Sequence, residues 1–281
     1  MENKCGLSIC ILSYNNIKIL DKCIQSIYEN CEGTNIEILV FDNGSTDNTE
    51  NVISINYPNV IVYRNHENIS FSRAFNILYS HTKHSIVGIF NNDILIKDPA
   101  TFKTVIREFS TNNRLGAINF KSVKPSGEID IVNKRKIQLI PLLSRMIIGV
   151  NKIKNHKTLS RMQLSRADNA EILQDSSIFI HKRAIGELNP YDESLKFYFT
   201  EDQLADLIQR NKYCLCYDPS ISLIHHHSLT MDGICKKSKR RLYLQDLMVY
   251  LLNYRLNFYN WPVVIIICLI ISLKVRYKKN G

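Results

Sequence analysis

The chain has 281 residues, of which 45% are hydrophobic, with only 10 Gly and 7 Pro, a composition typical of an ordinary globular protein with one sizeable core. The formal net charge is +10, but residues 236–281 contain ten Lys or Arg against one acid, Asp246, so the first 235 residues are close to neutral. The charge therefore belongs to the tail and does not indicate a domain that binds nucleic acid.

Three apolar runs in the first hundred residues end in clusters of polar side chains. The runs are 7–12, 36–41 and 86–90, and they are followed by Ser13-Tyr14-Asn15, Asp42-Asn43 and Asn91-Asn92-Asp93. Their length and β-branched content are typical of buried parallel strands. Because ligands bind outside the carboxyl ends of the strands in open α/β sheets, these polar groups predict a binding edge.

Helical patterns alternate with these strands in the way that builds βαβ units. Four apolar residues share one helical face after the first strand: Ile17, Leu20, Ile24 and Ile27. Further helices are predicted over 45–54, 71–80 and 99–111, and further strands over 60–63 and 115–120. The pattern predicts an α/β fold with a doubly wound, mostly parallel sheet over residues 1–120.

The second half of the chain is less regular. Residues 123–170 lose the periodicity, which fits either a functional insertion or a surface excursion. A strand pattern returns at 172–180, and residues 197–200 lead into a helix from about Glu201 to Arg210. Short strands at 214–217 and 221–224 follow, and the second ends in His225-His226-His227-Ser228.

The tail, residues 236–281, combines basic clusters with the longest apolar stretch, residues 261–273. Thirteen helical residues reach about 20 Å, which is too short for a hydrocarbon core of roughly 30 Å. Residues 242–258 favour an interfacial helix attracted to anionic lipid, with a terminal helix packed on the domain as the alternative. A nucleic-acid arm is disfavoured because stacking aromatics are not interleaved with the bases.

Cysteine usage and the N-terminus bear on the compartment. The eight cysteines contain no CxxC pair and mostly lie in apolar runs, as expected of buried thiols in a reducing compartment. The N-terminus enters a strand after a few residues and is unlike a signal peptide. We therefore expect a cytoplasmic protein that is peripheral on the inner face of the cell membrane.

Several of these motifs together resemble the family 2 glycosyltransferases of the A-type fold. The opening strand with Ser13-Tyr14-Asn15 and the segment Asp42-Asn43-Gly44-Ser45 resemble the start of that family, and Asn91-Asn92-Asp93 resembles its Asp-x-Asp metal motif. Thr200-Glu201-Asp202 matches the family's acidic pair, and His225 is placed like its late histidine. The chain departs from the family at Ser70, where Gly is common, and at Leu204, where a second Asp is common.

The resemblance implies roles for particular residues. The residues implied to bind the nucleotide sugar are Ser13, Tyr14, Asn15, Asp42, Asn43, Asn68, Arg73 and Asn92. Those implied to hold Mg²⁺ or Mn²⁺ are Asp93 and His225, and the acidic pair Glu201 and Asp202 is implied to be catalytic, with Asp202 as the base. The resemblance is strongest to rhamnosyltransferase-like members that extend bacterial surface polysaccharides on lipid carriers.

Chemical reasoning supports the same roles and leaves alternatives open. A carboxylate such as Asp93 can hold a divalent ion against diphosphate oxygens, but Asp is also a common turn residue. Asp42 can accept a hydrogen bond from a base N–H, form an Asx-turn, or do both. The start of a helix keeps the carboxylate of Asp202 ionised for proton transfer, although capping alone would place an acid there. His227 is a rival to His225 because alternate strand residues share a face.

We therefore expect an inverting, metal-dependent glycosyltransferase that moves a hexose or deoxyhexose from a UDP- or dTDP-linked donor to a saccharide, lipid-linked or not. The expected partners are the donor, this acceptor and a membrane surface, without nucleic acid. The predicted domains are a catalytic domain, 1–235, with a nucleotide-sugar half (1–120) and an acceptor half (121–235), and the membrane-associating tail. The alternatives are a catalytically silent nucleotide-sugar-binding protein and a sugar nucleotidyltransferase, which the absence of a Gly-rich phosphate loop disfavours.

Overall fold

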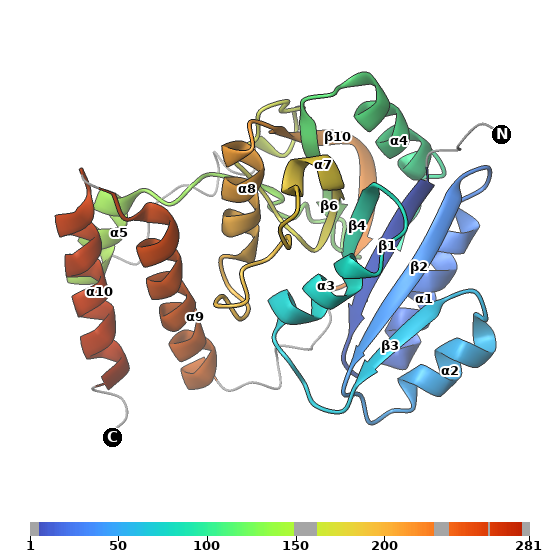
Figure 1. Cartoon of the computed structure of the whole chain (residues 1–281), viewed down its shortest axis with the longest axis horizontal. Coiled ribbons are helices and arrows are strands. Elements are labelled where there is room, and N and C mark those ends of the chain that lie inside the picture. Colours follow the sequence, from blue (N-terminus) through green and yellow to red (C-terminus); the bar gives the residue numbers. More distant parts are fainter. Residues whose placement is uncertain (1–5, 149–161, 228–235, 258, 277–281) are drawn as a thin grey trace.

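The computed structural model describes residues 6–148, 162–227, 236–257 and 259–276. Its centre is an eight-stranded sheet with the order β3-β2-β1-β4-β9-β6-β10-β5 (Figure 1). The strands are β1 (Gly6–Ser13), β2 (Asn35–Asn43), β3 (Ile61–Asn65), β4 (Ile86–Asn91), β5 (Ile94–Ile96), β6 (Leu115–Val123), β9 (Ser177–His181) and β10 (Cys214–His225). A second, two-stranded sheet pairs β7 (Asn133–Lys134) with β8 (Ile172–Leu173).

Helices cover both faces of the large sheet. One face carries α1 (Ile17–Glu29), α2 (Thr49–Asn56) and α4 (Thr101–Thr111), and the other carries α3 (Phe71–Ser80), α7 (Lys182–Ile185) and α8 (Thr200–Arg210). Leu20 and Ile24 of α1 are fully buried in the first core, and Phe75 and Leu204 are buried in the second. The doubly wound α/β arrangement predicted from the periodicity is confirmed.

The strand order places a binding crevice beside β1. This strand pairs in parallel with β2 on one side and with β4 on the other, so the chain winds outwards in opposite directions from it. The carboxyl ends of β1 and β4 therefore lie at a topological switch point, where α/β sheets bind ligands. The polar clusters at 13–15, 42–43 and 91–93 meet at this edge.

The sheet is more mixed than expected. Strand β9 lies between β4 and β6 and runs antiparallel to both, and β5 is antiparallel to β10. A strand that is buried on both faces has an apolar sequence whether it runs parallel or antiparallel to its neighbours, so the sequence pattern cannot reveal the direction of β9. The two short strands expected at 214–217 and 221–224 form one strand, β10, whose register shifts between Asp218 and Ser222.

The C-terminal tail is helical and packs on the rest of the protein. It contains α9 (Lys236–Tyr250), a π-helical turn (Leu251–Arg255) and α10 (Trp261–Arg276). With α5 (Leu139–Ile148), these helices form a third apolar cluster that includes Leu195 and Phe199 (Figure 1). In the described part of the chain, no helix has both the length and the apolar character needed to cross a membrane.

Some predictions concern residues outside the described ranges. These residues are Ser228 of the histidine run, residues 149–161 of the irregular segment, and the basic residues Lys278 and Lys279 at the end of the tail.

Candidate active site

The ends of β1 and β4 meet as expected for a nucleotide site. Asn92 donates a hydrogen bond from Nδ2 to Oγ of Ser13, at 3.3 Å, across the switch point. Asn15 is held against the loop after β2, because its backbone N–H donates to Ser45 Oγ and its Oδ1 accepts from the Thr46 N–H. Tyr14 lies half-buried between these groups. The loops that follow β1, β2 and β4 therefore form one continuous polar edge.

Asp42 and Asn43 organise the loop after β2. The buried carboxylate of Asp42 accepts from the N–H of Ser45, three residues on, at 2.9 Å, and its other oxygen faces Nε of Arg64 at 3.8 Å. Asn43 donates to the side chain of Asn68 at 3.1 Å and exchanges two hydrogen bonds with the backbone of Ile69. These contacts tie the loop after β2 to the entrance of α3.

Arg73 is not among the residues that make these contacts. It lies on α3 with an exposed side chain. The structure therefore brings seven of the eight residues predicted for the nucleotide sugar into the neighbourhood of the three strand ends, and it adds the cation of Arg64, which the sequence reasoning missed.

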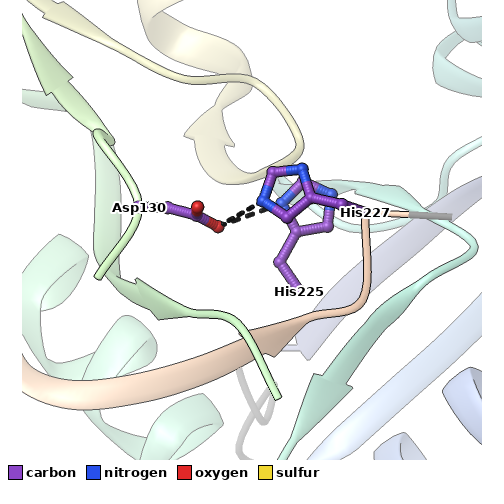
Figure 2. Close-up of side chains that lie close together, drawn as sticks. All are labelled: Asp130, His225 and His227. Carbon is purple, nitrogen blue, oxygen red and sulfur yellow. Dashed lines mark hydrogen bonds and ion pairs between the residues drawn. The ribbon is translucent and has the colours of Figure 1, made fainter. Parts of the chain in front are cut away.

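Two carboxylates and two imidazoles meet at the end of β10. Asp130 Oδ2 lies 2.7 Å from Nε2 of His227 and 3.5 Å from Nδ1 of His225, and the two rings stack with centroids 4.0 Å apart (Figure 2). On the other side of the His225 ring, Nε2 lies 3.4 Å from Oδ1 of Asp93. Possible ligand atoms of Asp130, His225 and His227 lie within 4.8 Å of one another.

The electrostatics of this cluster favour a cation. Burial alone would lower the pKa of His225, but hydrogen bonds and charges from Asp130 and Asp93 raise it to about 9. Burial would raise the pKa of Asp130, yet the two imidazoles hold it below its usual value. A place where two buried carboxylates stabilise an added proton also stabilises a divalent cation, which competes with protons for the same ligands.

A second group of charges lies at the start of α8. Lys134 of β7 donates from Nζ to Oε1 of Glu201 at 2.6 Å. Asp175, just after β8, accepts from the hydroxyl of Thr200 at 2.8 Å. Asp202 is buried beside them, with 8% of its surface exposed, and no side chain in the described ranges donates a hydrogen bond to it.

The environment separates the pKa values of these acids. Burial, followed by the charge of Glu201, raises the pKa of Asp202 to about 7. The pKa of Asp175 is raised to about 7 by the same causes in the same order. Burial opposes ionisation of Glu201, but Lys134 outweighs it and lowers the pKa of that carboxyl. Asp202 and Asp175 thus both have a proton affinity matched to neutral pH, but Asp175 is engaged by the hydroxyl of Thr200.

These acids line a cavity of about 400 Å³. One wall is charged or polar and includes Lys134, Asp175, Glu201 and Asp202. The lining also includes five aromatic side chains: Phe71, Phe197, Tyr198, Phe199 and Tyr243. Asn91, at the end of β4, also lines the cavity and is two residues from Asp93. The cavity therefore adjoins the sheet edge that carries the polar clusters.

Three of these charged residues were missed because they lie in or beside the irregular segment. Asp130 follows a tight turn in which Gly127 has φ of 85°, and the chain then returns along β6 so that the Asp130 N–H donates to Ser122 O. The sequence Pro125-Ser126-Gly127 is a turn signal that could have revealed this hairpin. Lys134 and Asp175 have no such signal, because two-residue strands show no periodicity.

The polar strand ends, the cavity and these two clusters together form the candidate site of this α/β protein. The family model described as "Glycosyl transferase family 2" matches residues 8–185, and the chain belongs to this family. It is a glycosyltransferase, as the resemblance noted in the sequence implied.

Known proteins agree with this assignment. A 214-residue alignment, 23% identical, covers 70% of the chain and 69% of an N-acetylglucosaminyl-diphospho-decaprenol L-rhamnosyltransferase from Mycobacterium tuberculosis. The mannosyltransferase PcManGT from Pyrobaculum calidifontis, solved with GDP-Man and Mn²⁺, has a TM-score of 0.60 at 13% identity, covering 96% of this chain and 70% of that one. TarS 1–349 from S. aureus has a TM-score of 0.56 at 15% identity, covering 96% and 81%. The last two similarities establish the fold.

Proposed function

We propose that this glycosyltransferase is inverting and metal-dependent, and that it transfers a deoxyhexose or hexose from a UDP- or dTDP-linked donor to a lipid-linked saccharide. The observation that carries the proposal is the buried Asp202, whose pKa is raised to about 7 in a cavity beside the strand ends of the donor edge. The mycobacterial relative supports a rhamnosyl donor and a lipid-linked acceptor, because its name describes an L-rhamnosyltransferase that acts on N-acetylglucosaminyl-diphospho-decaprenol.

Asp202 is the proposed base. The acceptor hydroxyl oxygen attacks the anomeric carbon while the bond from that carbon to the diphosphate oxygen breaks. The hydroxyl proton passes to Asp202, and the nucleoside diphosphate leaves with the bonding electrons. Glu201 is paired with Lys134, so it is unsuited to act as a nucleophile, and a single displacement gives inversion. Glu201 instead raises the proton affinity of Asp202.

The donor is assigned to the edge formed by β1, β2 and β4. Asp42 keeps lone pairs that can accept the ring N–H of uracil or thymine, which cytosine lacks. Asn43 and Asn68 hold the loop that is proposed to surround the base. Ser13 and Asn92 join the ends of β1 and β4, where the phosphates are proposed to bind. Tyr14, Asn15 and the exposed Arg73 remain proposed contacts, the arginine as a partner for phosphate.

The divalent ion is assigned to Asp93, Asp130, His225 and His227. Carboxylate oxygens suit Mg²⁺ and Mn²⁺, and two imidazole nitrogens shift the preference towards Mn²⁺. When bound, such an ion neutralises charge on the departing diphosphate. The protein's own contribution is to hold two buried carboxylates and the buried ring of His225 beside the exposed ring of His227.

The tail is proposed to attach the enzyme to the inner face of the cell membrane. Helix α10 exposes Trp261, Ile265, Ile266 and Leu269, which share one helical face, and Arg240 and Arg241 of α9 are exposed as well. Apolar and basic side chains together favour an anionic lipid surface. Residues 1–235 then form the catalytic domain, with 1–120 contacting the donor and 121–235 the acceptor, and residues 236–281 form the membrane-associating tail.

The proposal is tested by transfer from dTDP- and UDP-sugars to a polyprenyl-diphosphate GlcNAc acceptor with Mn²⁺, read by mass spectrometry. We expect a product one deoxyhexose or hexose heavier than the acceptor, and about 10²–10⁴ times slower formation of it by the Asp202→Asn variant. Donor binding without transfer or hydrolysis under any of these conditions would contradict the proposal and indicate a binding protein.

A further inference from the structure

Helix α9 reaches back to the loop that precedes the proposed base. Its only acid, Asp246, is buried and accepts hydrogen bonds from three successive backbone N–H groups. The donors are Lys196 at 3.3 Å, Phe197 at 2.9 Å and Tyr198 at 2.8 Å. A carboxylate that satisfies consecutive N–H groups fixes the backbone direction of the loop and hence the direction of its side chains.

The other side of this loop is held by α3. The hydroxyl of Ser72 donates to the carbonyl of Leu195, and the side chain of Asn76 exchanges two hydrogen bonds with the backbone of Tyr191. The loop is therefore fixed between α3 of the catalytic domain and α9 of the tail. Neither contact involves Asp93, Asp130, His225 or His227.

The aromatic wall of the cavity is shared between the loop and α9. Phe199 lies between two tyrosines of α9, with ring centroids 5.2 Å from Tyr243 and 5.5 Å from Tyr250, and the Tyr250 ring stacks at 13°. The hydroxyl of Tyr250 donates to Asp206 of α8 at 2.9 Å, while Tyr243 itself lines the cavity. Helix α9 thus contacts the loop, the cavity and the helix that carries Asp202.

We infer that α9 completes the acceptor subsite, with Tyr243 as part of its wall and Asp246 as a positioning residue for Phe197 and Tyr198. The inference rests on the proposed function. The cavity pairs aromatic faces, which pack on the apolar faces of a pyranose ring, with carboxylates, which accept from its hydroxyls. The ligand class is therefore the sugar ring of the acceptor that carries the attacking hydroxyl.

This arrangement has a consequence for the tail. Residues 236–281 are basic and apolar enough to suggest a membrane anchor alone, yet α9 within them holds part of the cavity wall. The proposed lipid-attached and acceptor-binding parts of the protein then share α9, whose hydrogen bonds and ring contacts reach the loop before Asp202.

The test compares three variants by steady-state kinetics and donor titration. Asp246→Asn keeps the shape of the side chain but replaces one carboxylate oxygen by an NH₂ group, which cannot accept from the backbone N–H groups of the loop. Because the loop is then held less firmly, the acceptor KM should rise about tenfold, with a smaller fall in kcat. Tyr243→Ala should raise the acceptor KM as well. The Kd for the donor nucleotide should stay within about twofold of wild type for both, because the donor edge lies on β1, β2 and β4.

Ile271→Ala is the matched control. This residue is fully buried in the same helical cluster, but it does not itself line the cavity or belong to the loop. It should lower the melting temperature and leave both kinetic constants unchanged below the transition. If Asp246→Asn fails to fold, Tyr243→Ala decides the matter, since that side chain is 39% exposed.

Two results would overturn the inference. One is a wild-type acceptor KM in Tyr243→Ala together with a wild-type or unmeasurable KM in Asp246→Asn. The other is an equal weakening of donor and acceptor by these variants, which would indicate general loss of structure. Wild-type protein that binds donor but transfers to no acceptor would instead refute the proposed function, and the two failures are thus distinguishable.

Discussion

The substitution Asp202→Asn tests the proposed base most fully. The amide keeps the size of the side chain but cannot accept a proton, and general base catalysis contributes about 10²–10⁴ in rate. We expect transfer to fall by that factor while the donor Kd stays the same. Loss of donor binding would place Asp202 in the nucleotide site instead, and another base would have to be sought.

The pH dependence of the wild-type enzyme sharpens this test. Because the pKa of Asp202 is raised to about 7, the carboxyl group of this residue is ionised in only about one molecule in ten at pH 6. The acceptor kcat/KM should therefore rise about fivefold from pH 6 to pH 7 and about tenfold from pH 6 to pH 8, and level off above pH 8. Glu201→Gln should move this rise to lower pH, because the charge of Glu201 is the largest cause of the shift after burial.

The free energy of unfolding should change with pH in the opposite direction to the rate of transfer. A carboxyl whose pKa is raised on folding binds more protons in the folded state, so the stability that it confers falls as the pH rises from about 4 to about 7. At pH 8 the buried charge of Asp202 is a cost, of up to about 4 kcal/mol for a three-unit shift. Asp202→Asn should thus raise the melting temperature at pH 8 and hardly change it at pH 4. A lower melting temperature at pH 8 would refute this reasoning.

Three further perturbations follow from the structure. Asp93→Ala should abolish metal-dependent turnover with the fold intact by circular dichroism, and undiminished transfer would remove Asp93 from the metal site. Asp130→Ala should weaken Mn²⁺ binding in a titration by at least about tenfold, because it removes the carboxylate shared by both imidazoles, whereas unchanged affinity would exclude Asp130 as a ligand. Deleting residues 236–281 should release the protein from anionic liposomes and abolish transfer while leaving donor binding. Equal sedimentation of the truncated and full-length forms would show that the tail is only a packed helical element.

The sequence predicts well which polar residues lie at the strand ends, because the signals for them are local. Ser13 and Asp42 follow an apolar run directly and Asp93 follows one after two Asn residues, and the carboxyl ends of parallel strands must share one edge of the sheet. His225 is found for the same reason, at the end of β10. The placement of these residues thus depends on a few neighbouring residues in the chain.

The remaining parts of the site depend on contacts between distant segments. Lys134 meets Glu201 across 67 positions, through a two-residue strand that has no readable periodicity. Asp246 is the one acid among the ten basic residues of the tail, and this unusual charge could have drawn attention to it. Its partners, however, are backbone N–H groups that no sequence motif marks. The antiparallel direction of β9 is likewise invisible, because a central strand is apolar in either orientation.

The most direct test of the central claim is the anomeric configuration of the product. Transfer from a nucleotide sugar of defined configuration should be followed by NMR on the isolated saccharide, using the one-bond carbon–hydrogen coupling at the new linkage. A single displacement with Asp202 as the base predicts the configuration opposite to that of the donor. Retention of the donor's configuration would contradict the account, because it would require a second nucleophile or a different geometry of attack.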